Sequence, residues 1–106
     1  VAGGTTQGKA IFEKIVKANP NVFLVLCGHC RDISYKNVQL DDDGDGNPDR
    51  TVYAILSNFQ GGKAGGGGYM RILDFSDSDI YIYTYSPYYD SCEYPKGKTE
   101  ATVPLP

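Results

Sequence analysis

Apolar residues near the start of the chain recur at the spacing of an α-helix. Residues 6–18 predict one amphipathic helix, because their apolar positions fall on one side of a 3.6-residue turn. Asn19 and Pro20 follow directly and are expected to end it. The predicted apolar stripe consists of Ile11, Ile15 and Ala18, widened by Phe12 and Val16.

The rest of the pattern is typical of β-strands. Residues 22–26 are continuously apolar and rich in β-branched and aromatic side chains, which predicts a strand buried on both faces. Looser alternation on either side of two polar turns predicts two antiparallel hairpins. The predicted hairpin strands are residues 33–40 with 51–57, and residues 69–75 with 80–85. The expected fold class is therefore α+β.

Length and composition predict a single domain over residues 1–106, with a modest core. Residues 88–106 are rich in proline and lack periodicity, so this tail is expected to be irregular. The first residue, Val1, is not methionine, which is expected of a cleaved precursor, an excised fragment or a chain whose tag was removed.

Charge and hydropathy exclude several classes of partner. The net charge of -3 argues against nucleic acid and against an anionic membrane. No apolar run approaches the roughly 20 residues that a bilayer-spanning helix needs. We therefore expect no nucleic acid and no membrane as partner.

Two cysteines bracket a glycine and a histidine directly after the predicted apolar strand. Cys27-Gly-His-Cys30 matches the active-site tetrapeptide of protein disulfide isomerases, so one alternative is a thioredoxin-like dithiol oxidoreductase. That chemistry requires a helix after the motif, whereas residues 32–40 alternate like a strand. The other alternative is a pair of unreactive thiols, with Cys27 shielded at the end of a buried strand. A third cysteine, Cys92, leaves the number of thiols odd.

The histidine of the same motif predicts a metal ligand. Gly28 permits a sharp turn at the end of the strand, and the imidazole of His29 can then present a ring nitrogen to a cation. Five segments in this order also resemble the C-terminal part of bacterial calcineurin-like metallophosphoesterases. The resembling segments are residues 10–16, 21–29, 51–60, 68–73 and 84–88.

The resemblance implies a function and a partial site. In that family a Gly-His-x-His motif helps to bind two divalent transition metals, which activate water for hydrolysis of phosphate esters. His29 matches the first histidine, but Arg31 replaces the second. A guanidinium cannot coordinate a cation, so Arg31 is expected either to bind substrate phosphate or to be solvated.

The family's other metal ligands lie upstream of the matching segments. The resemblance therefore implies that this chain forms half of the family's two-sheet sandwich, and that its missing partner is the N-terminal half of the parent chain. The fragment alone is expected to be inactive on phosphoester substrates and to have a tendency to form a homodimer through its uncovered sheet face.

An acidic loop between the strands of the first predicted hairpin suggests a second metal. Its aspartates are spaced like the ligands of an EF-hand calcium loop, with Gly46 at the turn. Val52 stands where the bidentate carboxylate should be, so a solvated acidic turn is the alternative. A third reading of the whole chain is thus a calcium-stabilised, non-catalytic module. The candidate ligands are Asp41, Asp43, Asp45 and Asp49.

Two further patterns have structural interpretations. Residues 61–68 are nearly all glycine, but the following residues read as strand rather than as the helix of a phosphate-binding loop, so we expect a flexible linker. The tyrosines of residues 80–85 are expected to half-bury on a packed sheet face, the alternative being a face that stacks on carbohydrate or bases.

Overall fold

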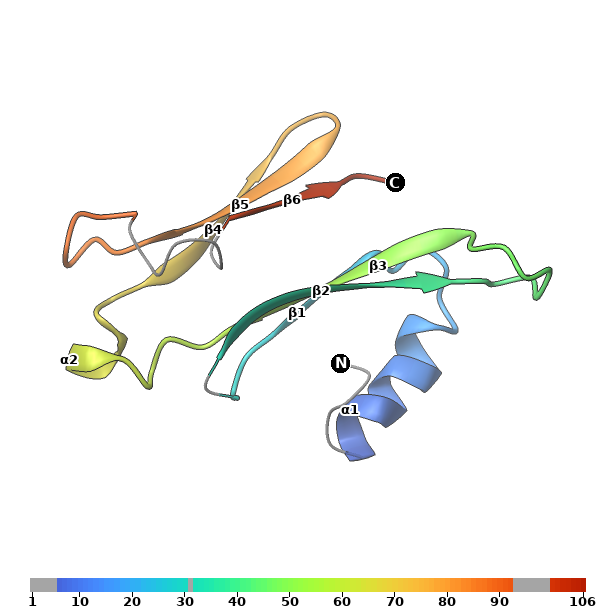
Figure 1. Ribbon diagram of the computed structural model, residues 1–106, viewed down its shortest axis with the longest axis horizontal. Coiled ribbons are helices and arrows are strands. Elements are labelled where there is room, and N and C mark those ends of the chain that lie inside the picture. The colour runs from blue at the N-terminus through green and yellow to red at the C-terminus, as the bar shows by residue number, and fades with distance from the viewer. Residues whose placement is uncertain (1–5, 31, 93–99) are drawn as a thin grey trace. The chain divides into compact units, whose positions relative to one another are not determined.

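The computed structural model describes residues 6–30, 32–92 and 100–106 and is α+β, as predicted (Figure 1). Two small sheets have the strand orders β1-β3-β2 and β4-β5-β6. No helix among the described residues has the length and apolar character needed to cross a membrane. The elements are α1 (Thr6–Ile11), the π-helical η1 (Phe12–Val16), β1 (Leu24–Cys27), β2 (Ile33–Leu40), β3 (Arg50–Ser57), α2 (Lys63–Gly66), β4 (Met70–Phe75), β5 (Asp79–Tyr85) and β6 (Ala101–Pro104).

The contacts divide the chain into two compact units, and the strands β1, β2 and β3 continue from one unit into the other. Among the described residues, unit 1 comprises 6–25 and 36–54, and unit 2 comprises 26–30, 32–35, 55–92 and 100–106. That the two fold as one domain over residues 1–106 stays a prediction.

The helix of unit 1 lies where it was predicted, although its buried side differs. Phe12 and Val16 are buried, whereas Ile11 and Ile15 are 51% and 53% exposed. The backbone N–H of Lys17 donates to the carbonyl of Phe12 at 2.9 Å, five residues back, so this turn is wider than an α-helical one. The core of the unit is made by Phe12, Val16, Leu40 and Val52, with Val22, Val25 and Val38 packed against it.

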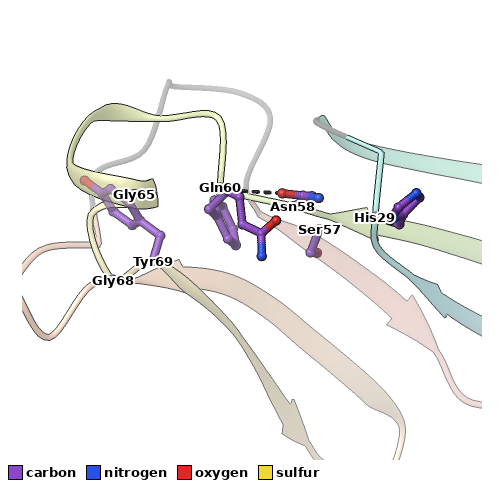
Figure 2. A pocket seen from close by; sticks show the side chains of 9 residues that line it. His29, Ser57, Asn58, Gln60, Gly65, Gly68 and Tyr69 are labelled. Carbon is purple, nitrogen blue, oxygen red and sulfur yellow. Dashed lines mark hydrogen bonds between the residues drawn. The ribbon is translucent and has the colours of Figure 1, made fainter.

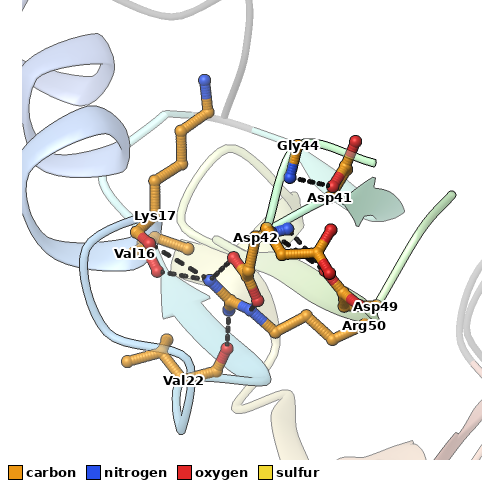
Figure 3. A network of polar contacts seen from close by, with 9 residues as sticks. Val16, Lys17, Val22, Asp41, Asp42, Gly44, Asp49 and Arg50 are labelled. Carbon is orange, nitrogen blue, oxygen red and sulfur yellow. Dashed lines mark hydrogen bonds and ion pairs between the residues drawn. The ribbon is translucent and has the colours of Figure 1, made fainter. Parts of the chain in front are cut away.

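Arg50, the first residue of β3, ties the end of this helix to the acidic loop (Figure 3). Its guanidinium donates to both carboxylate oxygens of Asp42, from Nε at 2.6 Å and from Nη2 at 3.1 Å. The same group donates to the carbonyl of Val22 at 2.7 Å and to that of Val16 at 3.1 Å. One side chain therefore satisfies the carbonyl of Val16 at the helix end, where intrahelical donors are missing, and that of Val22 before β1.

Strand β1 differs from its prediction in position and in burial. It spans residues 24–27 instead of 22–26, and Leu26 is 59% exposed, so the expectation of burial on both faces was wrong. Successive side chains of a strand point to opposite faces, and only Val25 packs against the core of unit 1. A continuous apolar run does not distinguish one covered face from two.

The second sheet lies in unit 2 and confirms the predicted second hairpin. Strands β4 and β5 pair antiparallel around residues 76–79, where the N–H of Ser76 donates to the carbonyl of Asp79 at 2.9 Å. On one face of β5, Ile80 and Ile82 are completely buried, whereas Tyr81 between them is 43% exposed. The tyrosine face is thus the more open side of this strand.

The expectation of an irregular tail over residues 88–106 was wrong for its last part. Ala101–Pro104 forms β6, which pairs antiparallel with β5 and places Val103 opposite Ile80. Val103 is completely buried, so the apolar contact explains why this short segment is a strand despite its proline. Residues 93–99 of the tail lie outside the described residues.

Candidate functional site

His29 stands on the loop that leaves β1, in unit 2, as the sequence predicted. Its φ of 71° is left-handed, a conformation that residues other than glycine adopt uncommonly and that Ala64 and Asp90 share in this chain. The side chain is exposed. The backbone N–H of Asn58, after β3, donates to the carbonyl of Asp32 at 3.0 Å and ties the loop to the neighbouring strand. Arg31 lies outside the described residues, so its expected role stays a prediction.

A hollow of about 470 Å³ in unit 2 lies beside this histidine (Figure 2). Figure 2 shows His29 at one side, Tyr69 with the glycine turn at the other, and the end of β3 between them. Besides three glycines of the turn, the hollow is lined by His29, Ser57, Asn58, Phe59, Gln60 and Tyr69.

The glycine turn that closes the hollow has a defined conformation, in contrast to the flexible linker expected from its composition. Backbone φ angles are positive at Ala64 and at every residue of Gly65–Gly68. A Cβ on Gly66 would lie 2.6 Å from the carbonyl oxygen of Phe59, so the backbones touch there because no side chain intervenes. Strand β4 follows the turn, which agrees with the exclusion of a phosphate-binding loop.

Polar groups at the end of β3 are held in place by short bonds. Asn58 Oδ1 accepts a hydrogen bond from the backbone N–H of Gln60 at 3.0 Å. Ser57 Oγ accepts one from Nε of Arg71 at 3.1 Å. Burial lowers the pKa of Arg71, which nevertheless remains charged at neutral pH. A guanidinium therefore stands behind the serine, while two carboxamides line the hollow itself.

The hollow offers an imidazole, a hydroxyl, a phenol and two carboxamides. His29 is the one imidazole in the chain, and no carboxylate is found among the described residues that line the hollow. Sequence reasoning singled out His29 but did not consider Asn58 and Gln60, which line the same hollow. Their place directly after β3, the strand beside β1, was the signal that could have pointed to them.

The thiols of the motif are exposed. Cys27 Sγ donates to the carbonyl of Ile55 at 3.4 Å, and its predicted shielding was wrong because the end of β1 is open to solvent. Cys30 and Cys92 are exposed free thiols too. The segment after the motif is the strand β2, as expected, so no helix N-terminus is present to stabilise a thiolate.

We therefore predict that Cys27 and Cys30 do not act as a redox couple. An insulin-reduction assay should give a rate no higher than that of a Cys30→Ser variant, because the thiolate lacks helix-dipole support. Turnover that depends on Cys30 would contradict the prediction.

The acidic loop between β2 and β3, in unit 1, brings together three of its four predicted ligands. Carboxylate oxygens of Asp41, Asp43 and Asp49 lie within 4.8 Å of one another, and all three residues are exposed. Backbone N–H groups of Gly46 and Gly44 donate to Asp41 and lower the pKa of its carboxyl. The fourth predicted ligand, Asp45, is outside this group and accepts a hydrogen bond from Asn47 N–H at 2.7 Å.

Comparison with known proteins finds a similar stretch in YvnB, an uncharacterized protein of Bacillus subtilis (strain 168). The two sequences are 51% identical over 83 residues, which make up 76% of this chain but 6% of YvnB. The chain thus spans a small part of that relative's length. No protein-family model matches the chain, and no solved structure matches it.

Proposed function

We propose that this chain is the C-terminal part of a metal-dependent phosphoesterase and that His29 is one of its metal ligands. The observation that supports this most is the position of His29, which is exposed and lies beside a polar hollow on the loop after β1. We propose further that the sheet β1-β3-β2 corresponds to one sheet of the two-sheet sandwich typical of calcineurin-like phosphoesterases.

The setting of His29 suits coordination. Within the described residues its ring makes no hydrogen bond, so both nitrogens are open to a ligand or a partner group. Its backbone is left-handed, and strained conformations of this kind cluster at ligand-binding sites. A neutral imidazole in such a place is the commonest protein ligand for a divalent transition metal.

One histidine is too few for the reaction. A two-metal centre needs several ligands from different segments and, when its metals are bound, lowers the pKa of a water that attacks phosphorus. We propose that the remaining ligands come from an N-terminal half in a longer parent protein, and that Arg31 contacts the substrate phosphate. The parent would hydrolyse phosphoesters, whereas this chain alone would not.

The test is hydrolysis of an aryl phosphate and an aryl phosphodiester in the presence of manganese, zinc or iron. We expect no metal-dependent turnover by this chain, and turnover by the parent protein. His29→Ala should lower kcat/KM of the parent at least about 100-fold, since losing a group that only orients a metal ligand already costs 10–100-fold. Lys36→Ala, which removes an exposed side chain on β2, is the control and should leave the rate unchanged. Equal rates for the His29 and Lys36 variants would contradict the proposal.

A second candidate function is calcium binding by the acidic loop, and the clustering of three carboxylates favours it. Like charges this close repel one another unless a cation neutralises them. Oxygen ligands on an exposed loop with no bidentate carboxylate at its end are suited to weak binding, in the millimolar range of extracellular calcium modules. Calcium would then stabilise unit 1 without taking part in catalysis.

We predict that millimolar calcium raises the melting temperature and shifts the amide signals of residues 41–49. Asp43→Asn should abolish both effects, whereas Asp77→Asn, in the turn between β4 and β5, should leave them unchanged. The effect should weaken as the pH falls through the lowered pKa of the Asp41 carboxyl, because carboxylates must be deprotonated to bind the cation. If the amide signals of residues 41–49 stay unchanged at about 10 mM calcium, the interpretation as a solvated acidic turn is favoured.

A further inference from the structure

Ser57, the last residue of β3, lines the hollow with a hydroxyl whose proton is available to a ligand. Its oxygen accepts a hydrogen bond from Nε of Arg71 at 3.1 Å. A guanidinium has no acceptor atom, so the hydroxyl of Ser57 cannot donate back to Arg71. Within the described residues this hydroxyl has no other partner. Its proton can therefore be donated to an acceptor in the hollow.

Asn58, the next residue, lines the same hollow and also has its acceptor atom occupied. The backbone N–H of Gln60 donates to the side-chain oxygen of Asn58 at 3.0 Å. Because a backbone N–H can only donate, this bond identifies the oxygen of the carboxamide and places the NH2 group at its other end. Figure 2 shows this nitrogen on the side of His29. The NH2 group has no acceptor in the part of the chain that the structure describes, so Asn58 offers a second donor.

Two neighbouring side chains with occupied acceptors and available donors suit a ligand that is rich in acceptors. The hydroxyl of Ser57 accepts a hydrogen bond from a charged group, which polarises it and strengthens its own donation. The bond from Arg71 holds Ser57, and the bond from Gln60 holds Asn58. Donors that the protein fixes in advance stabilise negative oxygen atoms better than donors that must first reorient. The end of β3 is therefore suited to an oxyanion.

We propose that the hydroxyl of Ser57 and the side-chain NH2 of Asn58 bind oxygen atoms of a phosphoryl group, and that Arg71 is a positioning residue for Ser57. His29 lines the same hollow, so the phosphoryl group would lie in the hollow that holds the proposed metal ligand. Arg31, proposed above as a phosphate contact, would add its charge to the same group. The assignment to a phosphoryl group rather than to another oxyanion rests on the proposed phosphoesterase function.

Phosphate binding can be tested on this chain without metal, by titration at neutral pH with the ionic strength held constant by chloride. Inorganic phosphate, added to about 50 mM to detect binding in the millimolar range, should shift the side-chain amide signals of Asn58 and the backbone signals of residues 57–60. Asn58→Asp keeps an oxygen for the N–H of Gln60 but replaces the donor with a negative charge, so phosphate affinity should fall at least about tenfold. Asn37→Asp, the same change at an exposed position of β2 in unit 1, should leave the affinity unchanged.

Ser57 and Arg71 are tested in the same titration. Ser57→Ala should lower phosphate affinity about tenfold, and Ser57→Thr, which keeps a hydroxyl, should recover most of it. Arg71→Gln should weaken binding too, because a neutral donor polarises the hydroxyl of Ser57 less than a guanidinium does. The melting temperature of each variant separates a loss of affinity from a loss of the fold, and the Asn58→Asp result does not depend on either residue.

No phosphate-dependent shift at residues 57–60, equal affinity of the Asn58→Asp and Asn37→Asp variants, or binding of acetate as tight as that of phosphate would overturn the inference. Metal coordination by His29 is measured separately. Phosphate binding without coordination would leave the two donors standing and remove the phosphoesterase, whereas coordination without phosphate binding would remove this inference alone.

Discussion

Replacing Arg50 with alanine is expected to lower the free energy of unfolding of unit 1 by about 3 kcal/mol. The side chain of Arg50 is only 12% exposed, and that of its partner Asp42 is 25% exposed. The variant would lose a bidentate ion pair and would also leave the carbonyls of Val22 and Val16 without this donor. Leaving a buried polar group without a partner costs more free energy of unfolding than its hydrogen bond had contributed.

The measurement is urea unfolding followed by the amide signals of Phe12 and Val52 in the unit 1 core. Arg50→Lys should recover only part of the loss, because an ammonium cannot reproduce the planar fork that reaches Asp42 and two carbonyls. The control is Glu13→Ala, which breaks an exposed ion pair with Lys17 and should cost less than about 0.5 kcal/mol. If Arg50→Ala and Glu13→Ala lower the free energy of unfolding by similar amounts, the hydrogen bonds and the ion pair of Arg50 contribute little to stability.

Substituting alanine at Gly66 should destabilise unit 2 by about 2–4 kcal/mol and distort the hollow. The residue has φ of +99°, and a Cβ would lie 2.6 Å from the carbonyl oxygen and 2.9 Å from the carbonyl carbon of Phe59. Both neighbours are backbone atoms at the end of β3, so neither can move aside as a flexible side chain would.

Gly65→Ala is the matched control for this prediction. Gly65 has φ of +67°, but nothing lies within 4 Å of its would-be Cβ, so only the backbone cost of about 1 kcal/mol remains. The melting temperatures of the two variants should therefore differ clearly, and Gly66→Ala should have the lower one. A Gly66 variant as stable as the Gly65 variant would mean that the turn does not pack on Phe59 as described.

Much of the fold could be predicted because local patterns match the tertiary contacts. Alternation identified β2 to β5, and Ser76–Asp79 identified the second hairpin, in which β5 buries Ile80 and Ile82 on one face. The helix was found, but its predicted stripe combined Ile11 and Ile15, which are exposed, with Phe12 and Val16, which are buried. Helical periodicity places these two pairs next to each other on the helix surface. Which pair is buried depends on the surface that packs against the helix, and the local sequence does not show it.

Other features depend on contacts that no local pattern shows. Strand β6 forms because Val103 meets Ile80, a residue more than twenty positions earlier, so nothing near it in sequence predicts it. The glycine turn of residues 65–68 reads as a linker until its contact with Phe59 is known. At the candidate site, His29 was singled out by its motif, whereas Asn58 and Gln60 belong to no motif and are identified by their place in the lining of the hollow.

Coordination of a metal by His29 is the most direct test of the proposed function. Crystals of the parent protein grown with zinc should give an anomalous diffraction peak about 2.1 Å from a ring nitrogen of His29. In the His29→Ala variant the same peak should lose occupancy. Zinc bound entirely by other residues, with the His29 ring outside the coordination shell, would contradict the account.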